Sequence, residues 1–344
     1  MPTFLGAMVV ALGGLVMGSA AWPMKVMRKF QFEHFWFVGS LVGFLIMPWT
    51  ITLLFCPHAF AAYGSVDALQ LLKANVFSLA WGVANVLCGL CFMRIGFALS
   101  SGVLTGLGVS VGVTLPMIVK ASGLFSSAPN LGSPAGRMVL VGVPVMLGGV
   151  VFVSLAGFGK DRALGKVQRT SGSFLGGWIM VVVAGVLSAG ISFAFVYSQG
   201  PIVAAMKAQG AGDIPANFAV WAVGLVGGAL VNIFYPIYLM TAHRSWGVLR
   251  ECWRDFALAA LMGINFSVAV SLMGRGMLLL GVLGASVGFG IQQAMQMLGS
   301  QGVGFVSGEW RGVYGTPRHQ MYLAIVILIC AAILMAYGNT LAKA

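Results

Sequence analysis

The stretch from residue 75 to residue 119 constrains this chain more than any other part of it. It holds two apolar runs, each long enough to form a membrane-spanning helix, separated by one charged residue, Arg94. A helix of about 20 apolar residues crosses the hydrocarbon core of a bilayer. Glycines recur through both runs, and small residues allow helices in lipid to pack closely. The stretch therefore predicts two tightly packed transmembrane helices.

The rest of the chain has the same character. Hydrophobic residues make up 59% of it and charged residues only 8%, whereas about 25% of a soluble domain is charged. The hydrophobic pattern predicts an all-α, polytopic membrane protein with ten transmembrane helices. The predicted spans cover residues 3–24, 35–55, 75–93, 95–119, 138–158, 172–197, 217–240, 256–273, 277–307 and 321–341.

The positive charges indicate the orientation of these spans. The net charge is +12, but the basic residues lie in loops between apolar spans and form no continuous face for nucleic acid. Most of the 19 Lys and Arg residues fall in alternate loops on one side. The positive-inside rule makes that side cytoplasmic, so we expect both termini on the opposite, outer side. No positive charge precedes the first span, which we therefore expect to remain as a helix and not to be cleaved as a secretory signal.

The longest basic connection, residues 159–170, divides the chain into two halves, 1–165 and 166–344, with five predicted spans each. An odd number of spans forces the two halves into opposite orientations, as in inverted-repeat transporters. Asn85 and Gly96 in the first half have counterparts at the same spacing in Asn265 and Gly276. We interpret this weak internal echo as a sign of two inverted five-helix repeats.

A polar stripe runs along the third predicted span. Asn75, Ser78, Trp81 and Asn85 recur at three- and four-residue steps, so they share one face of a helix. An amide at membrane depth is costly unless it faces the protein interior or a wet cavity. The stripe therefore indicates that this helix lines a solute pathway.

The ninth predicted span carries a second polar face. Gln292, Gln293 and Gln296 lie there with Phe289 and Ser300. Amides both donate and accept hydrogen bonds, which suits ligands rich in hydroxyl groups. Hydrogen bonding between helices, worth about 0.6 kcal/mol for each bond, is the alternative. For three amides on one helix we favour a cavity.

Two further features admit both a structural and a binding role. Ser188 and Ser192 share a face of the sixth span among small residues, which also suits close helix packing. Trp22 lies near the inner end of the first span, where tryptophan ordinarily anchors a helix at the membrane interface. Its flat ring could equally stack on a sugar.

The acidic residues all fall at or outside the ends of predicted spans. A proton-coupled carrier usually places an acid or a histidine in its pathway, and the best-placed group is the pair Glu33–His34 at the cytoplasmic entrance to the second span. A solvated loop pair is the alternative. Cys88 and Cys91 form a CxxC motif inside an apolar span, which favours packing over metal binding. No catalytic constellation, phosphate loop or cofactor motif is present, so we expect neither an enzyme nor a resident cofactor.

Several short motifs extend over most of the chain. They are Pro23-x-Lys25, Arg28-Lys29, Glu33-x-x-Trp36, Pro48-Trp49, Trp81-Gly82 with Asn85 and Gly89-Leu90, Gly136-Arg137-Met138, Gly185 with Ser188-Ala189-Gly190 and Ser192-Phe193-Ala194, and Glu309-Trp310. In these motifs the chain resembles the L-rhamnose-proton symporters, a branch of the drug/metabolite transporter superfamily. The resemblance implies a ten-helix carrier of the bacterial inner membrane that takes up a deoxy sugar together with a proton. The region 274–296, which holds the glutamine face, departs from the family.

Together these observations predict a secondary transporter that takes up L-rhamnose or a related monosaccharide by alternating access, with the site near the midplane. The predicted partners are the sugar, the proton and the lipid bilayer. An exporter of metabolites or drugs and a non-transporting membrane sensor are the alternatives, although the absence of any soluble domain argues against the sensor. The predicted sugar contacts are Asn85, Gln292, Gln293, Gln296, Ser188 and Ser192, with Trp22 or Trp81 as an apolar wall, and Glu33 or His34 carries the proton.

Overall fold

The computed structural model describes residues 2–20, 22–95, 97–119, 123–165 and 174–342, and within these ranges it contains helices and no strand. The helices of the first half are α1 (Pro2–Ser19), η1 (Trp22–Val26), α2 (Phe32–Ser40), η2 (Leu41–Ile46), α3 (Met47–Phe55), α4 (Ala59–Gly64), α5 (Ala68–Ile95), α6 (Phe97–Ile118), η3 (Gly123–Ser127) and α7 (Pro134–Ala163). Those of the second half are α8 (Phe174–Ser188), α9 (Gly190–Ala208), α10 (Asp213–Gly224), α11 (Val226–Ala242), α12 (Val248–Glu251), α13 (Trp253–Leu280), α14 (Gly284–Val306) and α15 (Thr316–Leu341).

Many of these helices are long and apolar enough to cross a membrane. Within the described residues, 7 helical segments qualify by length and composition, and the bent pair α10 and α11 makes up to 8. The described apolar part of α6, Gly102–Ile118, is shorter. The all-α, multi-span class predicted from the sequence is confirmed, whereas the count of ten spans remains a prediction.

Three predicted spans are broken in the structure. The span 217–240 bends by 55° between α10 and α11, and the span 172–197 is divided between α8 and α9, which continues to Ala208. The span 35–55 widens into a π-helix, η2, just before Pro48. Proline has no N–H to donate, so it interrupts the regular helical hydrogen bonding. A neighbouring helix satisfies one exposed carbonyl here, because Ser267 Oγ on α13 donates to the Gly43 oxygen at 2.5 Å.

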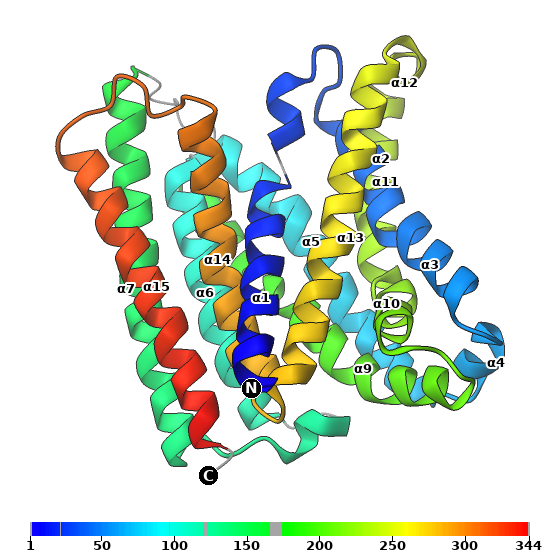
Figure 1. The fold of residues 1–344 in the computed structure, drawn as a ribbon. Helices are drawn as coiled ribbons and strands as arrows, with labels where there is room; N and C mark the ends of the chain where they lie inside the picture. The colour runs from blue at the N-terminus through cyan, green and yellow to red at the C-terminus, as the bar shows by residue number, and fades with distance from the viewer. Residues whose placement is uncertain (1, 21, 96, 120–122, 166–173, 343–344) are drawn as a thin grey trace.

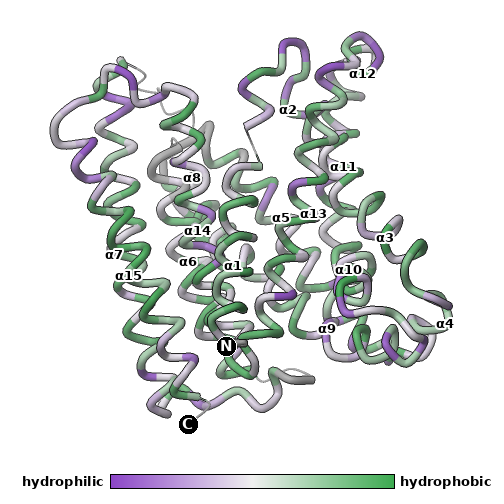
Figure 2. The backbone as a smooth tube through the Cα atoms, in the orientation of Figure 1, coloured by the Kyte–Doolittle hydropathy of each residue, from purple (hydrophilic) through white to green (hydrophobic). Residues whose placement is uncertain are grey.

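The helices form two groups with α1 and α5 between them (Figure 1). One group contains α6, α7, α14 and α15, and the other contains α2, α3, α10, α11 and α13. The start of α1 and the end of α15 lie at the same end of the molecule, and α12 lies at the opposite end. Hydrophilic residues concentrate towards these two ends, with a largely hydrophobic band between them (Figure 2). This distribution is the one that a bilayer requires.

Glycines permit the closest approaches between helices. A Cβ atom added to Gly82 on α5 would lie 2.9 Å from the Gly228 Cα atom on α11, and one added to Gly43 would lie 3.0 Å from the Gly263 Cα atom on α13. Only residues without a side chain allow two backbones to come this close. The predicted role of Gly82 in packing is therefore confirmed.

Candidate functional site

A cavity of about 460 Å³ lies between α2, α5 and α11, near the end of the molecule that carries α12. A second hollow of about 200 Å³ lies between α1, α2 and α13. Met24, Phe35 and Trp36 line both, so the two hollows adjoin. The larger one is also lined by Phe32, Glu33, Asn85, Val86, Cys88, Leu90, Tyr235, Leu239 and His243.

A hydrogen-bonded network joins the three helices around the larger cavity. Trp36 Nε1 donates to Asn232 Oδ1 at 3.0 Å, and Asn85 Nδ2 approaches the same oxygen at 3.4 Å. Asn232 Nδ2 in turn donates to the Gly228 carbonyl at 2.8 Å. Asn232 is fully buried, whereas Trp36 and Asn85 reach the cavity. Asn232 therefore fixes the positions of the indole and the amide that a ligand would meet.

Sequence reasoning found Asn85 and missed Asn232. Both are amides inside apolar spans, so the argument that identified Asn85 applied equally to Asn232. Trp36 was noted only as part of a motif. Its contact with Asn232 joins residues 196 positions apart, and no local pattern reveals such a pair.

Trp81 lies behind the wall of the second hollow. Its ring stacks on Phe266 with a centroid separation of 5.8 Å and lies 5.4 Å from the Phe44 ring. Phe44 and Phe266 line the hollow themselves. Trp81 thus supports an aromatic surface, and the tryptophan that lines the cavity is Trp36.

Glu33 and His34 face different surroundings although they are adjacent in sequence. The Glu33 carboxylate lies 3.2 Å from His243 Nδ1 on the far side of the cavity, and both residues line it. His34 is 1% exposed, and Nδ1 accepts the Gln31 N–H at 3.2 Å. Its Nε2 lies 3.0 Å from the Ser245 carbonyl, to which it donates when Nδ1 accepts. Both ring nitrogens of His34 are therefore engaged, and Glu33 is the member of the pair that reaches the cavity.

Two sets of contacts, which we call anchors, hold the connection between α1 and α2. Both lie at the end of the molecule that carries α12. Lys25 Nζ pairs with Glu309 Oε1 at 2.5 Å, and Lys160 Nζ on α7 pairs with Glu309 Oε2 at 3.2 Å. The buried carboxylate of Asp255 on α13 accepts three backbone hydrogen bonds in addition. The donors are the N–H groups of Arg28, Lys29 and Phe30, at 2.9, 2.7 and 3.1 Å. The connection is thus tied to both groups of helices.

The contribution of the Glu309 ion pairs to the stability of the fold should depend on pH. Burial by itself would raise the pKa of the Glu309 carboxyl, but the hydrogen bonds and charges of Lys25 and Lys160 outweigh it and hold the pKa below its ordinary value of 4.5. A group with a lowered pKa stabilises the fold above its ordinary pKa, and this contribution disappears as the pH falls through the lowered value.

We therefore expect Glu309→Gln to lower thermal stability near neutral pH and to have a smaller effect at about pH 3, where more of the carboxyl is protonated. The Glu309 side chain is 42% exposed, so solvent screening limits the loss to about 1 kcal/mol. Melting followed by tryptophan fluorescence at both pH values measures it. An equal difference in melting temperature between variant and parent at the two pH values would contradict a stabilising role for the ionised Glu309 carboxylate.

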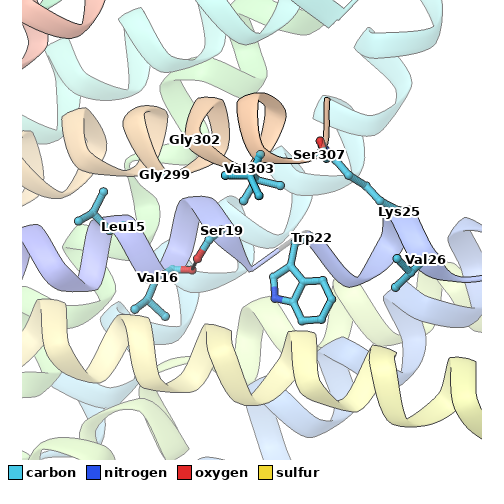
Figure 3. Close-up of a pocket in the computed structure, with 11 residues that line it drawn as sticks. Leu15, Val16, Ser19, Trp22, Lys25, Val26, Gly299, Gly302, Val303 and Ser307 are labelled. Atoms are coloured by element: carbon cyan, nitrogen blue, oxygen red, sulfur yellow. Dashed lines mark hydrogen bonds between the residues drawn. The ribbon is translucent and has the colours of Figure 1, made fainter. Parts of the chain in front are cut away.

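Trp22 lies at a separate groove of about 540 Å³ between the α1–η1 segment and α14. Figure 3 shows Trp22, Ser19 and Val303 around it, with Lys25 and Ser307 at one end. The Trp22 side chain is 40% exposed. The structure therefore does not bring Trp22 together with Asn85.

The glutamines also lie apart from the cavity that Asn85 lines. Gln292 Nε2 donates to Gln296 Oε1 at 2.9 Å, so these two amides pair along α14. Gln293, one position further along, is half-buried. The backbone of α14 at Gln292 packs against Gly14 of α1.

Ser188 and Ser192 differ from each other in their surroundings. Ser188 Oγ donates to the Gly185 carbonyl at 2.7 Å and faces Gly108 of α6, which fits close helix packing. Ser192 is fully buried, and its hydroxyl has no hydrogen-bond partner among the described residues. Neither serine lines the two adjoining hollows.

Comparison with known proteins identifies the family. A family model described as L-rhamnose-proton symport protein matches residues 3–342. The chain belongs to the L-rhamnose-proton symporter family. Two curated relatives, each named L-rhamnose-proton symporter, come from Yersinia pestis bv. Antiqua (strain Antiqua) and Yersinia pseudotuberculosis serotype O:3 (strain YPIII). Each is 33% identical over 254 residues, which cover 73% of this chain and 71% of the relative.

Membership of the symporter family confirms the resemblance seen in the sequence motifs. It also places the chain among proton-coupled sugar transporters and not among enzymes. The symporter family match extends through the region 274–296 that looked divergent.

Proposed function

We propose that this protein takes up L-rhamnose, or a closely related monosaccharide, by proton symport across the bacterial inner membrane. The observation that carries this proposal is the cavity in which an amide, an indole and a carboxylate meet, contributed by Asn85, Trp36 and Glu33. Sugar hydroxyls need groups that both donate and accept hydrogen bonds. The apolar face of a deoxy sugar needs a flat aromatic partner.

Each cavity residue has a distinct role in this proposal. Asn85 bonds sugar hydroxyls, Trp36 supplies the apolar wall, and Asn232 positions both of them. Glu33 is the proton-binding carboxylate. The residues predicted on other helices remain proposed contacts for parts of the path that this cavity does not include; they are Gln292, Gln293, Gln296, Ser188, Ser192 and Trp22.

The packing of the helices supports ten spans in two inverted halves. In this scheme α1 corresponds to α8 with α9, α5 to α13, and α6 to α14. Accordingly α1 packs on α13 and α14, while α8 with α9 packs on α5 and α6. The two glycine contacts are also equivalent, because Gly43 and Gly263 join the second and eighth spans and Gly228 and Gly82 join the seventh and third.

The positive charges support a cytoplasmic orientation for the cavity. Arg250 belongs to α12, which marks the end of the molecule near this cavity, and Lys25 and Lys160 lie at the same end, where both pair with Glu309. By the positive-inside rule this end faces the cytoplasm, and both termini face the periplasm. The structure then corresponds to the cytoplasm-facing stage of an alternating-access cycle.

Uptake of labelled L-rhamnose into proteoliposomes, with and without an inward proton gradient, tests the function. We expect accumulation that collapses when an uncoupler is added. Asn85→Ala should weaken sugar affinity about five- to 150-fold, since a lost hydrogen bond in a desolvated site costs about 1–3 kcal/mol. Asn130→Ala, which removes an exposed amide in the connection before α7, is the matched amide control outside the cavity.

The outcomes separate the alternatives. Equilibration of the sugar at a rate and level that do not depend on the proton gradient would indicate a facilitator. Resistance or efflux without rhamnose uptake would indicate an exporter, and the absence of any saturable flux would contradict transport altogether.

A further inference from the structure

A cluster of buried polar side chains lies at the end of the molecule opposite the cavity. It comprises Gln199 on α9, Asn217 and Trp221 on α10, and Ser271 on α13. Each is at least nine-tenths buried. In each, one polar atom has no hydrogen-bond partner among the described residues. These are Gln199 Oε1, Asn217 Oδ1, Trp221 Nε1 and Ser271 Oγ.

Contacts around Phe195 hold this polar cluster together. The Phe195 ring on α9 stacks on the Trp221 ring at 5.2 Å. Asn217 Nδ2 donates to the Ser271 carbonyl at 2.9 Å, and a Cβ atom added to Gly274 would touch both Phe195 and Asn217 Oδ1. Gln199 lies one helical turn beyond Phe195, on the same face of α9. Three helices therefore converge on a surface that is aromatic at its centre and polar around it.

An ion cluster covers the outer end of this surface. Asp213 begins α10 one turn before Asn217, and its carboxylate pairs with Lys207 of α9 at 2.7 Å and with Arg275 of α13 at 3.1 Å. Arg275 lies one turn beyond Ser271. The same three helices that carry the polar cluster are thus joined by ion pairs at the periplasmic surface, where the side chains of all three ionic residues are partly exposed.

Leaving several buried polar atoms unpaired costs free energy, and groups of this kind call for an explanation. The position of the polar cluster in the inverted-repeat scheme supplies an explanation. The cytoplasmic cavity lies where the end of the first span, the start of the second and the third meet, and the end of the seventh span, α11, completes its wall. The polar cluster lies where the sixth, seventh and eighth meet, which is the equivalent position in the inverted half. Glu33 in the first turn of α2 and Asp213 in the first turn of α10 also correspond.

We propose that this polar cluster is the closed periplasmic entrance of the sugar path and binds the hydroxyl groups of the monosaccharide when it opens. The inference rests on the proposed transport function. The Asp213 ion cluster holds the entrance shut in the cytoplasm-facing stage. Opening breaks these exposed ion pairs and frees the amide, indole and hydroxyl groups of the polar cluster to meet the sugar, with Phe195 or Trp221 against its apolar face.

The first experiment measures access to the polar cluster without any sugar. Ser271→Cys is labelled from the outside with a membrane-impermeant maleimide, above the background of the parent chain's own cysteines. Adding Asp213→Asn should raise the labelling rate about three- to tenfold, the population shift expected from losing two exposed ion pairs. Glu251→Gln makes the same charge change in the Lys29–Glu251 pair at the opposite end and should leave the rate unchanged. Elution from size-exclusion chromatography reports whether each variant is folded.

The second experiment measures uptake. Asn217→Ala and Ser271→Ala should each raise the sugar concentration for half-maximal uptake several-fold, without changing the dependence on the proton gradient. A parent chain that fails to carry L-rhamnose overturns the proposed function, whereas the labelling result still decides whether an entrance exists here. Labelling that Asp213→Asn leaves unchanged, together with parent-like uptake by Asn217→Ala, overturns the entrance.

Discussion

Glu33→Gln is expected to abolish proton-driven accumulation of sugar while leaving sugar exchange across the membrane intact. Glutamine keeps the size and hydrogen-bonding capacity of the side chain but cannot take up a proton. With one proton per sugar, a gradient of one pH unit supports about tenfold accumulation. The variant should lose this factor and only equilibrate the sugar. Uptake driven by a pH gradient, compared with counterflow exchange at equal pH, measures the two activities separately.

Glu251→Gln is the control for this experiment, because it removes a carboxylate at the same end of the molecule, one that pairs with Lys29 outside the cavity. It should accumulate sugar as the parent does. The groups that act electrostatically on Glu33 in the described part of the chain are His34 on its own helix and His243 across the cavity. His243→Asn should therefore shift the pH at which accumulation is half-maximal. Full gradient-driven accumulation by Glu33→Gln would exclude this carboxylate from coupling.

Gly82→Ala is expected to destabilise the contact between α5 and α11. The new Cβ would lie 2.9 Å from both the Cα atom and the carbonyl oxygen of Gly228, and neither backbone atom can move without shifting α11. Overpacking of this kind costs about 1–3 kcal/mol. Because α11 carries Asn232, the shift should also disturb the network at Trp36 and Asn85 and lower sugar affinity.

Gly148→Ala on α7 is the matched control, since nothing lies within 4 Å of its added Cβ. Alanine is favoured over glycine in a helix interior by roughly 0.5–1 kcal/mol, so this variant should be as stable as the parent or slightly more stable. Melting temperatures in detergent compare the two variants. Equal melting temperatures would mean that α5 and α11 are not in backbone contact.

The sequence was most informative where the type of a residue is unusual for the segment in which it lies. Asn85 stands out as an amide in an apolar span and Glu33 as an acid beside one, and both line the cavity. Glycine spacing likewise predicted the close approach at Gly82. These signals are local, because the free-energy cost of a polar group or the absence of a side chain can be read without knowing the partner.

The residues that contact these side chains could not be predicted from the sequence in the same way. His243 faces Glu33 from 210 positions away, and Asn232 meets Asn85 from 147 positions away. The Gly43 carbonyl in the π-helix of the second span accepts its hydrogen bond from Ser267, 224 positions away. The glutamine face was predicted to line a cavity, whereas the same four-residue spacing brings Gln292 and Gln296 together on their own helix.

The two anchors on the connection between α1 and α2 limit how far the cytoplasmic mouth can widen. Lys25 is held by Glu309, whereas Arg28 is held by Asp255, so three peptide units join the two groups of helices here. Fully extended, they span about 10 Å, and the side chain of Lys25, which is held at its Nζ, adds its own length to this reach. A larger separation requires one anchor to release, and the exposed Glu309 pair would yield before the buried Asp255 carboxylate with its three N–H donors. The connection thus acts as a tether of limited length, held weakly at Glu309 and strongly at Asp255.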